Sequence, residues 1–139
     1  MNALVDTSVW SLALGRKARE LSSGDRALVH GLSDLIREGR ARIIGAVRQE
    51  LLSGIKVPEQ YQRLRIQLRA FPDEPISTSD YESAANACDQ FRSKGIAASP
   101  IDSLICAVAL DRQWSVFTTD SDFEQYARVL PVKLHSHHG

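Results

Sequence analysis

Residues 4–8 of the chain read LVDTS, and residues 116–120 read VFTTD. Each stretch is a short apolar run that leads to an aspartate, Asp6 or Asp120, with hydroxyl side chains beside it. Such runs predict buried strands, so each aspartate is expected at the carboxyl end of a strand. In a parallel sheet these ends share one edge, where ligands bind, and the two carboxylates are therefore expected to converge.

The rest of the chain alternates between strand-like and helix-like segments. Further strands are predicted over residues 42–44 and 132–134, with a short one at Ile76. Helices are predicted over residues 7–14, 23–39, 46–53, 58–70, 79–94, 99–111 and 121–128, the second of them capped by Ser23. This alternation predicts an α/β domain with a mostly parallel central sheet flanked by helices on both faces.

Length and composition are typical of one soluble domain. The 139 residues fit a domain over residues 1–134 and a polar tail over 135–139. No stretch approaches the roughly 20 apolar residues of a membrane span, and the N-terminus lacks the features of a secretion signal. Cys88 and Cys106 lie among small apolar residues and are expected to be reduced core residues. A cytoplasmic protein is therefore expected.

Charge is unevenly distributed although the formal net charge is zero. Residues 1–70 hold 12 Lys and Arg against 7 Asp and Glu, whereas residues 71–139 hold 5 against 10. Two interpretations fit this asymmetry. It indicates either a basic surface for a polyanion beside an acidic pocket, or two solvated faces of opposite charge.

Each candidate acid has a structural interpretation as well as a chemical one. Asp6 and Asp120 are favoured N-cap residues for the helices that follow them. Asp102 lies in the first turn of its helix, where Ser99 completes the pattern of a capping box and the helix dipole favours an ionised carboxylate. Glu50 is expected on the half-buried face of its helix, where it requires either a salt bridge to an arginine or a metal ion.

Taken together, the acids favour a divalent metal site. Charged carboxylates that converge repel one another, so they require a cation, and all-oxygen ligands suit Mg²⁺ or Mn²⁺. Such ions polarise a phosphodiester and activate a water. Zinc is not indicated, because His30 stands alone and the other histidines lie in the C-terminal tail. The sequence also has no glycine-rich phosphate loop of the Walker type.

Four motifs, in the family's order, resemble those of VapC-type PIN-domain toxins. They are LVDTSVW at residues 4–10, QELLSG at 49–54, PIDSLICAVA at 100–109 and FTTDSDF at 117–123. Each motif alone is weak evidence, whereas the ordered set is fairly specific and spans nearly the whole chain.

The resemblance implies a PIN-like fold and a metal-dependent endoribonuclease, the toxin of a type II toxin–antitoxin system. It implies Mg²⁺ or Mn²⁺ as cofactor, a homodimer, and a cognate antitoxin that masks the site. The catalytic and metal-binding roles that it carries over fall on Asp6, Glu50, Asp102 and Asp120, with Asp122 as a further metal ligand. Accessory polar roles fall on Thr7, Ser8 and Thr118. Which of Asp120 and Asp122 lies closer to the metal stays open, because family members vary in the fourth motif.

Residues of the basic half of the chain are expected to contact the RNA substrate or the partner protein. Arg42 and Arg48 are candidates for binding RNA phosphates on either side of the cut, although these arginines could instead be solvated or meet the antitoxin. The segment Val57 to Phe71, rich in Leu, Ile and Tyr, is expected to help form an apolar groove for a partner helix. An arginine of the partner that enters the acidic pocket would inhibit the site.

Three other classes of protein share features with this sequence. A signalling receiver domain requires paired acids near its first strand and a lysine after a late strand, but residues 1–5 contain no acid and Lys133 lies within the last apolar run. A non-catalytic binding protein of the same fold is disfavoured because all four main acids are present. A DNase of similar fold stays open, because metal-dependent phosphodiester chemistry is the same for RNA and DNA and the contacts that read the 2′-hydroxyl are not evident.

Overall fold

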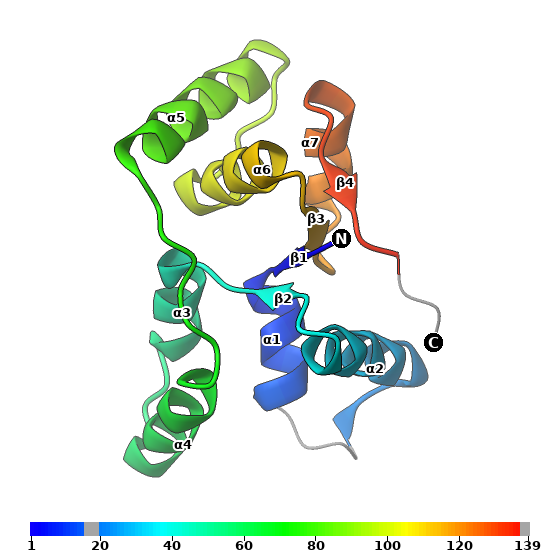
Figure 1. Cartoon of the computed structure of the whole chain (residues 1–139), viewed down its shortest axis with the longest axis vertical. Coiled ribbons are helices and arrows are strands. Elements are labelled where there is room, and N and C mark those ends of the chain that lie inside the picture. The colour runs from blue at the N-terminus through cyan, green and yellow to red at the C-terminus, as the bar shows by residue number, and fades with distance from the viewer. Residues whose placement is uncertain (16–19, 137–139) are drawn as a thin grey trace.

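Parallel strands form the central sheet of the computed structural model, which describes residues 1–15 and 20–136 (Figure 1). They are β1 (Ala3–Val5), β2 (Ala41–Arg42), β3 (Ser115–Phe117) and β4 (Lys133–Leu134), in the spatial order β2-β1-β3-β4. All three strand pairs are parallel, and Ala3 lies opposite both Ala41 and Ser115. The predicted α/β fold with a mostly parallel sheet is therefore confirmed.

The helices of the described residues surround this sheet. They are α1 (Thr7–Leu14), α2 (Ser23–Arg37), α3 (Gly45–Leu52), α4 (Pro58–Leu68), α5 (Thr78–Ser93), α6 (Pro100–Arg112) and α7 (Asp122–Val129). In Figure 1, α5 and α6 lie on one side of the sheet and α1 and α2 on the other, whereas α3 and α4 extend to one side. Helix α6 contacts both β1 and β3. The helix that carries Asp102 is thereby held against the two strands that lead to Asp6 and Asp120.

Serine side chains fix the starts of several helices. Ser22 is the N-cap of α2 and accepts a hydrogen bond from a backbone amide of the first turn. The prediction that Ser23 is the cap is wrong by one residue, since Ser23 is already helical. At the start of α5, Ser77 and Asp80 form a reciprocal capping box, in which each side chain accepts from the backbone amide of the other.

Two strand predictions are corrected. Strand β2 ends at Arg42, because α3 begins three residues later at Gly45, and Ile43 makes only an isolated parallel bridge with Asp73. Ile76 lies outside the strands, since it stands between a proline, which has no amide hydrogen to donate, and the capping serine of α5.

Buried aromatic contacts fix α1 behind the end of β1. The Trp10 side chain is fully buried, and its indole N–H donates to the Val5 carbonyl oxygen at 3.1 Å. Its ring lies 4.9 Å from that of Phe71, centroid to centroid. A buried tryptophan needs a partner for its N–H, and here that partner belongs to the residue just before Asp6. The packing of α1 therefore helps to define where Asp6 lies.

Other predictions about the chain meet mixed outcomes. Both cysteines are free thiols; Cys106 is buried, as expected of a core residue, whereas Cys88 is only half-buried. None of the described helices is long and apolar enough to cross a membrane. In the predicted tail, His135 packs on Phe117 with ring centroids 4.7 Å apart, and residues 137–139 lie outside the described residues.

Candidate active site

Asp6 and Asp120 lie at the same edge of the sheet. Val5 at the end of β1 is opposite Phe117 at the end of β3, and the Asp6 amide donates to the Phe117 carbonyl oxygen at 2.9 Å. Asp120 follows β3 by three residues. Asp6 is 7% exposed and Asp120 is exposed. The edge therefore combines a carboxylate inside the protein with one at its surface.

Two hydroxyl groups hold one oxygen of Asp6. Thr118 Oγ1 donates to Asp6 Oδ2 at 2.7 Å, and Ser8 Oγ donates to the same oxygen at 3.0 Å. The Thr119 amide donates to Ser8 Oγ and the Asp120 amide donates to Thr118 Oγ1, each at 3.0 Å. Because an ionised carboxylate oxygen only accepts hydrogen bonds, the Ser8 and Thr118 hydroxyls donate to Asp6 while they accept from the two amides.

The capping interpretation fits Asp120 better than Asp6. Asp6 occupies the N-cap position of α1, but its side chain accepts no hydrogen bond from the amides of that helix. Asp120 Oδ1 accepts from the Asp122 amide, the first of α7, at 2.9 Å, although the N-cap residue of that helix is Ser121 and Asp120 lies one position before it. Asp6 is therefore oriented by side chains from two separate segments of the chain, and Asp120 by the local turn.

Asp102 completes only half of the predicted capping box. Its amide donates to Ser99 Oγ at 3.1 Å, but its carboxylate turns away and accepts the Tyr126 hydroxyl at Oδ2, at 2.7 Å. Tyr126 was missed by the sequence analysis. It follows Asp122 by four residues on α7, and that spacing, which puts two side chains on one helix face, is the signal that could have identified it.

Three carboxylates form a compact cluster. One oxygen from each of Asp102, Asp120 and Asp122 lies within 4.8 Å of the others. None of the salt bridges in the described part of the chain reaches these three or Asp6. Burial raises the pKa of the Asp102 carboxyl, the hydrogen bond from Tyr126 opposes that shift, and the charges of Asp6 and Asp120 add to it. The cluster thus concentrates negative charge without a salt bridge to any cation of the described residues.

Glu50 lies outside this cluster. It is exposed on α3, whose buried residues are Val47 and Leu51, so the prediction of a half-buried position is wrong. The reason is that α3 buries a narrow face, and Glu50 falls beside it. Ala46, one turn earlier on α3, lines a cavity together with Ile101 of α6. Helix α3 therefore approaches the helix that carries Asp102, although the Glu50 carboxylate makes no hydrogen bond to the described residues.

The remaining predicted residues have distinct surroundings. Thr7 Oγ1 is buried and has no hydrogen-bond partner among the described residues. Arg48 bonds to Asp73 at 2.9 Å and to the carbonyl oxygens of Leu68 and Phe71, so it fastens the segment after α4. The Arg42 guanidinium lies 6.0 Å from the Trp114 ring centroid. Trp114 precedes β3, whereas the acids follow strand ends. RNA contacts by Arg42 and Arg48 stay predictions.

The fold and the site at its sheet edge define the class of protein to which the chain belongs. Residues 3–129 match the PIN domain family. Because that match covers most of the chain, the protein is a member of the PIN domain family.

Solved structures share this fold across nearly the whole chain. FitAcB from Neisseria gonorrhoeae is 19% identical, with 96% of each chain covered and a TM-score of 0.72. VapBC2 from Rickettsia felis, bound to a DNA fragment from its promoter, is 20% identical, with 97% of this chain and 98% of that chain covered and a TM-score of 0.72. A toxin–antitoxin complex from Klebsiella pneumoniae is 20% identical, with 96% and 100% covered and a TM-score of 0.65. Comparison with curated proteins gives no significant match.

Proposed function

We propose that this PIN-domain protein is a metal-dependent endoribonuclease, the toxin of a type II toxin–antitoxin pair that acts in the cytoplasm. The observation that carries the proposal is the cluster of Asp102, Asp120 and Asp122, with Asp6 near enough to raise the pKa of Asp102 and with no salt bridge from the described residues to any of the four. Like charges this close are costly unless a cation joins them.

The donor atoms suit Mg²⁺ or Mn²⁺. They are carboxylate oxygens, which hard divalent ions prefer, and the site includes no thiol or imidazole among them. Asp102, Asp120 and Asp122 are the residues placed to share an ion, and Asp6 and Glu50 are proposed to take part directly or through water. A divalent ion there would polarise the scissile phosphate and make an attacking water more acidic.

The chain's own residues would orient this chemistry. Ser8 and Thr118 fix the Asp6 carboxylate, which is the most buried of the acids. Asp120 and Asp122 are exposed, so they lie where a substrate phosphate can approach. Thr7, whose buried hydroxyl has no partner within the described chain, remains an accessory candidate.

RNA is the proposed substrate because the four motifs resemble those of VapC-type toxins and because structures of the same fold come from toxin–antitoxin complexes. A DNase at the same acidic site is the second candidate, since the metal chemistry is shared. A non-catalytic PIN-like binding protein is the third.

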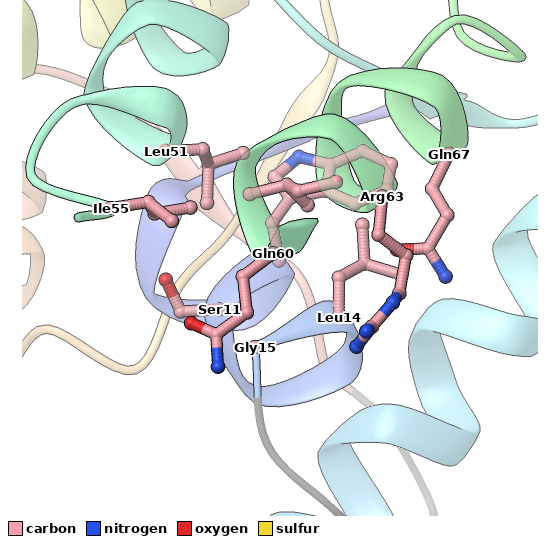
Figure 2. A pocket seen from close by; sticks show the side chains of 10 residues that line it. Ser11, Leu14, Gly15, Leu51, Ile55, Gln60, Arg63 and Gln67 are labelled. Atoms are coloured by element: carbon pink, nitrogen blue, oxygen red, sulfur yellow. The ribbon is translucent and has the colours of Figure 1, made fainter. Parts of the chain in front are cut away.

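A groove between α1, α3 and α4 supports the proposed antitoxin partner. It has a volume of about 440 Å³ and is lined by apolar and polar residues, among them Trp10, Leu14, Leu51, Ile55, Gln60, Arg63, Leu64 and Gln67. Figure 2 shows Leu51 and Ile55 at one end, Gln67 at the other, and Gln60 and Arg63 between them. Four of these residues come from the segment Val57 to Phe71. An amphipathic partner helix with an acidic residue opposite Arg63 would fit such a groove.

The proposed homodimer has a candidate surface on α5 and α6. An apolar cavity of about 450 Å³ is lined there by Ala84 and Leu104, among others, and by Tyr81, which is 59% exposed. An exposed ring that lines an apolar cavity is a patch that two copies of the chain would bury against each other across a two-fold axis. Sedimentation of the purified protein would report the oligomeric state.

The test of the enzyme is cleavage of a mixed cellular RNA pool by the purified, partner-free protein, with and without Mg²⁺ or Mn²⁺. Asp6→Asn serves as the inactive variant. Discrete metal-dependent cuts that the variant lacks would support the proposal, and mapping their ends would identify the target. If the folded, metal-loaded and partner-free protein leaves RNA intact and cleaves a DNA pool instead, the result would favour the DNase. Absence of both would favour the binding protein.

A further inference from the structure

Tyr126 is a buried side chain at the acidic cluster for which neither the motifs nor the proposed function provides a role. It is 2% exposed, and its hydroxyl donates to Asp102 Oδ2 at 2.7 Å. The bond joins α7 to α6, two helices that begin at the same sheet edge. Asp122, which belongs to the cluster, lies one turn earlier on α7. Tyr126 therefore fastens together the two helices that carry Asp102 and Asp122.

The Tyr126 ring has little freedom to move. Its centroid lies 4.8 Å from that of Phe91 on α5 and 4.9 Å from that of Phe123 on α7. Phe91 and Phe123 are themselves fully buried. Close packing on two sides fixes the direction of the ring and with it the place of the hydroxyl. The hydroxyl can therefore define the orientation of the carboxylate that it meets.

The same arrangement recurs at two other acids of the site. Asp6 Oδ2 accepts from two hydroxyls, and Asp120 Oδ1 accepts from a backbone amide. At Asp6 and Asp120 the other carboxylate oxygen has no hydrogen-bond partner among residues 1–15 and 20–136, whereas the Asp102 carboxylate also interacts with the Ser99 side chain, which lowers its pKa. The protein thus leaves one oxygen of Asp6 and one of Asp120 available, and at Asp102 the hydrogen bond from Tyr126 engages Oδ2.

We propose that Tyr126 is a positioning residue for the metal centre: it holds Oδ2 of Asp102 so that this acid offers a single oxygen, Oδ1, to a divalent ion. The inference rests on the proposed function, because it requires that an ion binds at the cluster. One oxygen per carboxylate suits the small octahedral shell of Mg²⁺, whereas larger ions such as Ca²⁺ accept two from the same group. Partners that orient a metal ligand in this way typically change metal affinity by roughly 10- to 100-fold when they are removed.

Tyr126→Phe removes the hydroxyl alone, since the ring and its packing remain. Binding of Mn²⁺ to the whole, RNA-free protein would be measured by calorimetry for the wild type and this variant. Tyr61→Phe is the matched control, because the Tyr61 hydroxyl on α4 makes no hydrogen bond to the described residues. Phe91→Leu is the packing control, because it loosens the same aromatic cluster and leaves the hydroxyl of Tyr126 in place.

The expected result is a Mn²⁺ dissociation constant roughly 10-fold higher in Tyr126→Phe. Tyr61→Phe is expected to bind as the wild type does, and Phe91→Leu is expected to be weakened less than Tyr126→Phe, because Phe123 still packs on the Tyr126 ring. Phe91→Leu is expected to lower the thermal midpoint of unfolding. A large loss of stability with only a small loss of Mn²⁺ affinity would separate the effect of packing from the effect of the Tyr126 hydroxyl. In RNA cleavage, Tyr126→Phe would need a correspondingly higher Mn²⁺ concentration for half-maximal rate and recover most of its rate at saturation.

Wild-type affinity in Tyr126→Phe would overturn the inference, and so would equal weakening in Phe91→Leu, since Tyr126 would then act through packing alone. These outcomes leave the proposed function intact. A wild-type protein that binds no Mn²⁺ would instead remove the metal centre on which the proposed function depends, and the inference with it.

Discussion

At the scale of single residues, the clustered carboxylates that we propose to bind a metal ion lower the stability of the metal-free protein. The pKa of Asp102 is raised by burial and by the charges of Asp6 and Asp120, against the hydrogen bond from Tyr126. A carboxyl whose pKa is higher in the folded than in the unfolded chain destabilises the fold when ionised, and that cost disappears as the pH falls through the folded pKa. In the metal-free protein at neutral pH, Asp102 therefore works against folding.

Asp102→Asn is expected to raise the thermal midpoint of the metal-free protein at pH 7, because the amide carries no charge and its oxygen can still accept the Tyr126 hydroxyl. Thermal unfolding in a chelator would be compared with unfolding in excess Mg²⁺, which should stabilise the wild type more than the variant. The advantage of the variant should shrink as the pH is lowered toward the Asp102 pKa. A variant less stable than the wild type in the chelator would contradict the repulsion inferred here.

The sequence predicted the positions of the strand-end acids better than their surroundings. Asp6 and Asp120 lie at one sheet edge, as the short apolar runs before them indicated. Glu50 is exposed where a half-buried face was predicted, because helical spacing leaves the edge of a narrow apolar face undecided. The Tyr126 contact joins residues 24 positions apart in the chain. It depends on how α7 packs against α6, which local spacing does not specify.

At the scale of elements, a charged cluster fastens α6 to the start of α5. Arg112 donates to both carboxylate oxygens of Asp80, at 2.6 and 3.0 Å, and to the Pro75 carbonyl oxygen at 2.9 Å. Asp80 is 6% exposed, and it also accepts from the Ser77 amide in the capping box. The hydrogen bond from Arg112 is the main reason that the pKa of Asp80 lies well below its usual range.

Asp80→Asn is expected to lower the free energy of unfolding by roughly 3 kcal/mol at neutral pH, since it removes one partner of a largely buried pair. Because the folded pKa of Asp80 is depressed, its contribution is complete above the unfolded pKa and is lost as the pH falls below about 4. Urea unfolding of both proteins at several pH values should show the difference narrowing in acid.

Asp89→Asn is the control for this prediction. Asp89 pairs with Arg92 on the same helix, but the two side chains are 72% and 71% exposed, so the loss should be under about 1 kcal/mol. Equal destabilisation by Asp80→Asn and Asp89→Asn would mean that the Arg112 contact contributes no more than a surface pair.

Element types were predictable because apolar periodicity reports which faces are buried. The exceptions are residues whose secondary structure depends on neighbouring prolines and helix caps or on pairing with a distant segment. Ile76 is apolar and short-range propensity favours a strand, yet the proline before it and the helix cap after it leave no partner strand to pair with. Ile43 and Asp73 form a bridge across 30 residues, and that pairing is visible only in the folded chain.

At the scale of the whole molecule, the groove beside α4 and the acidic sheet edge are separate features on one small domain. The groove is lined by residues of α1, α3 and α4, and none of the clustered acids lines it. Helix α1 nevertheless connects the two, since it begins next to Asp6 and ends at the groove near Leu14. Because the groove and the clustered acids share no residue, a substitution in the groove can abolish partner binding and leave the acids unchanged.

Ile55→Arg is expected to weaken binding of the proposed antitoxin roughly 10-fold or more, because it puts a long charged side chain where an apolar partner face would pack. Ile66→Arg is the matched control: Ile66 lies on α4, is 64% exposed, and is not among the residues that line the groove. The protein and the partner that accompanies it from its native locus would be titrated, with RNA cleavage as a second readout. Ile55→Arg should cleave RNA at the wild-type rate when alone and resist inhibition by the partner, whereas Ile66→Arg should be inhibited normally. If both variants bind the partner as the wild type does, the groove is not the docking site.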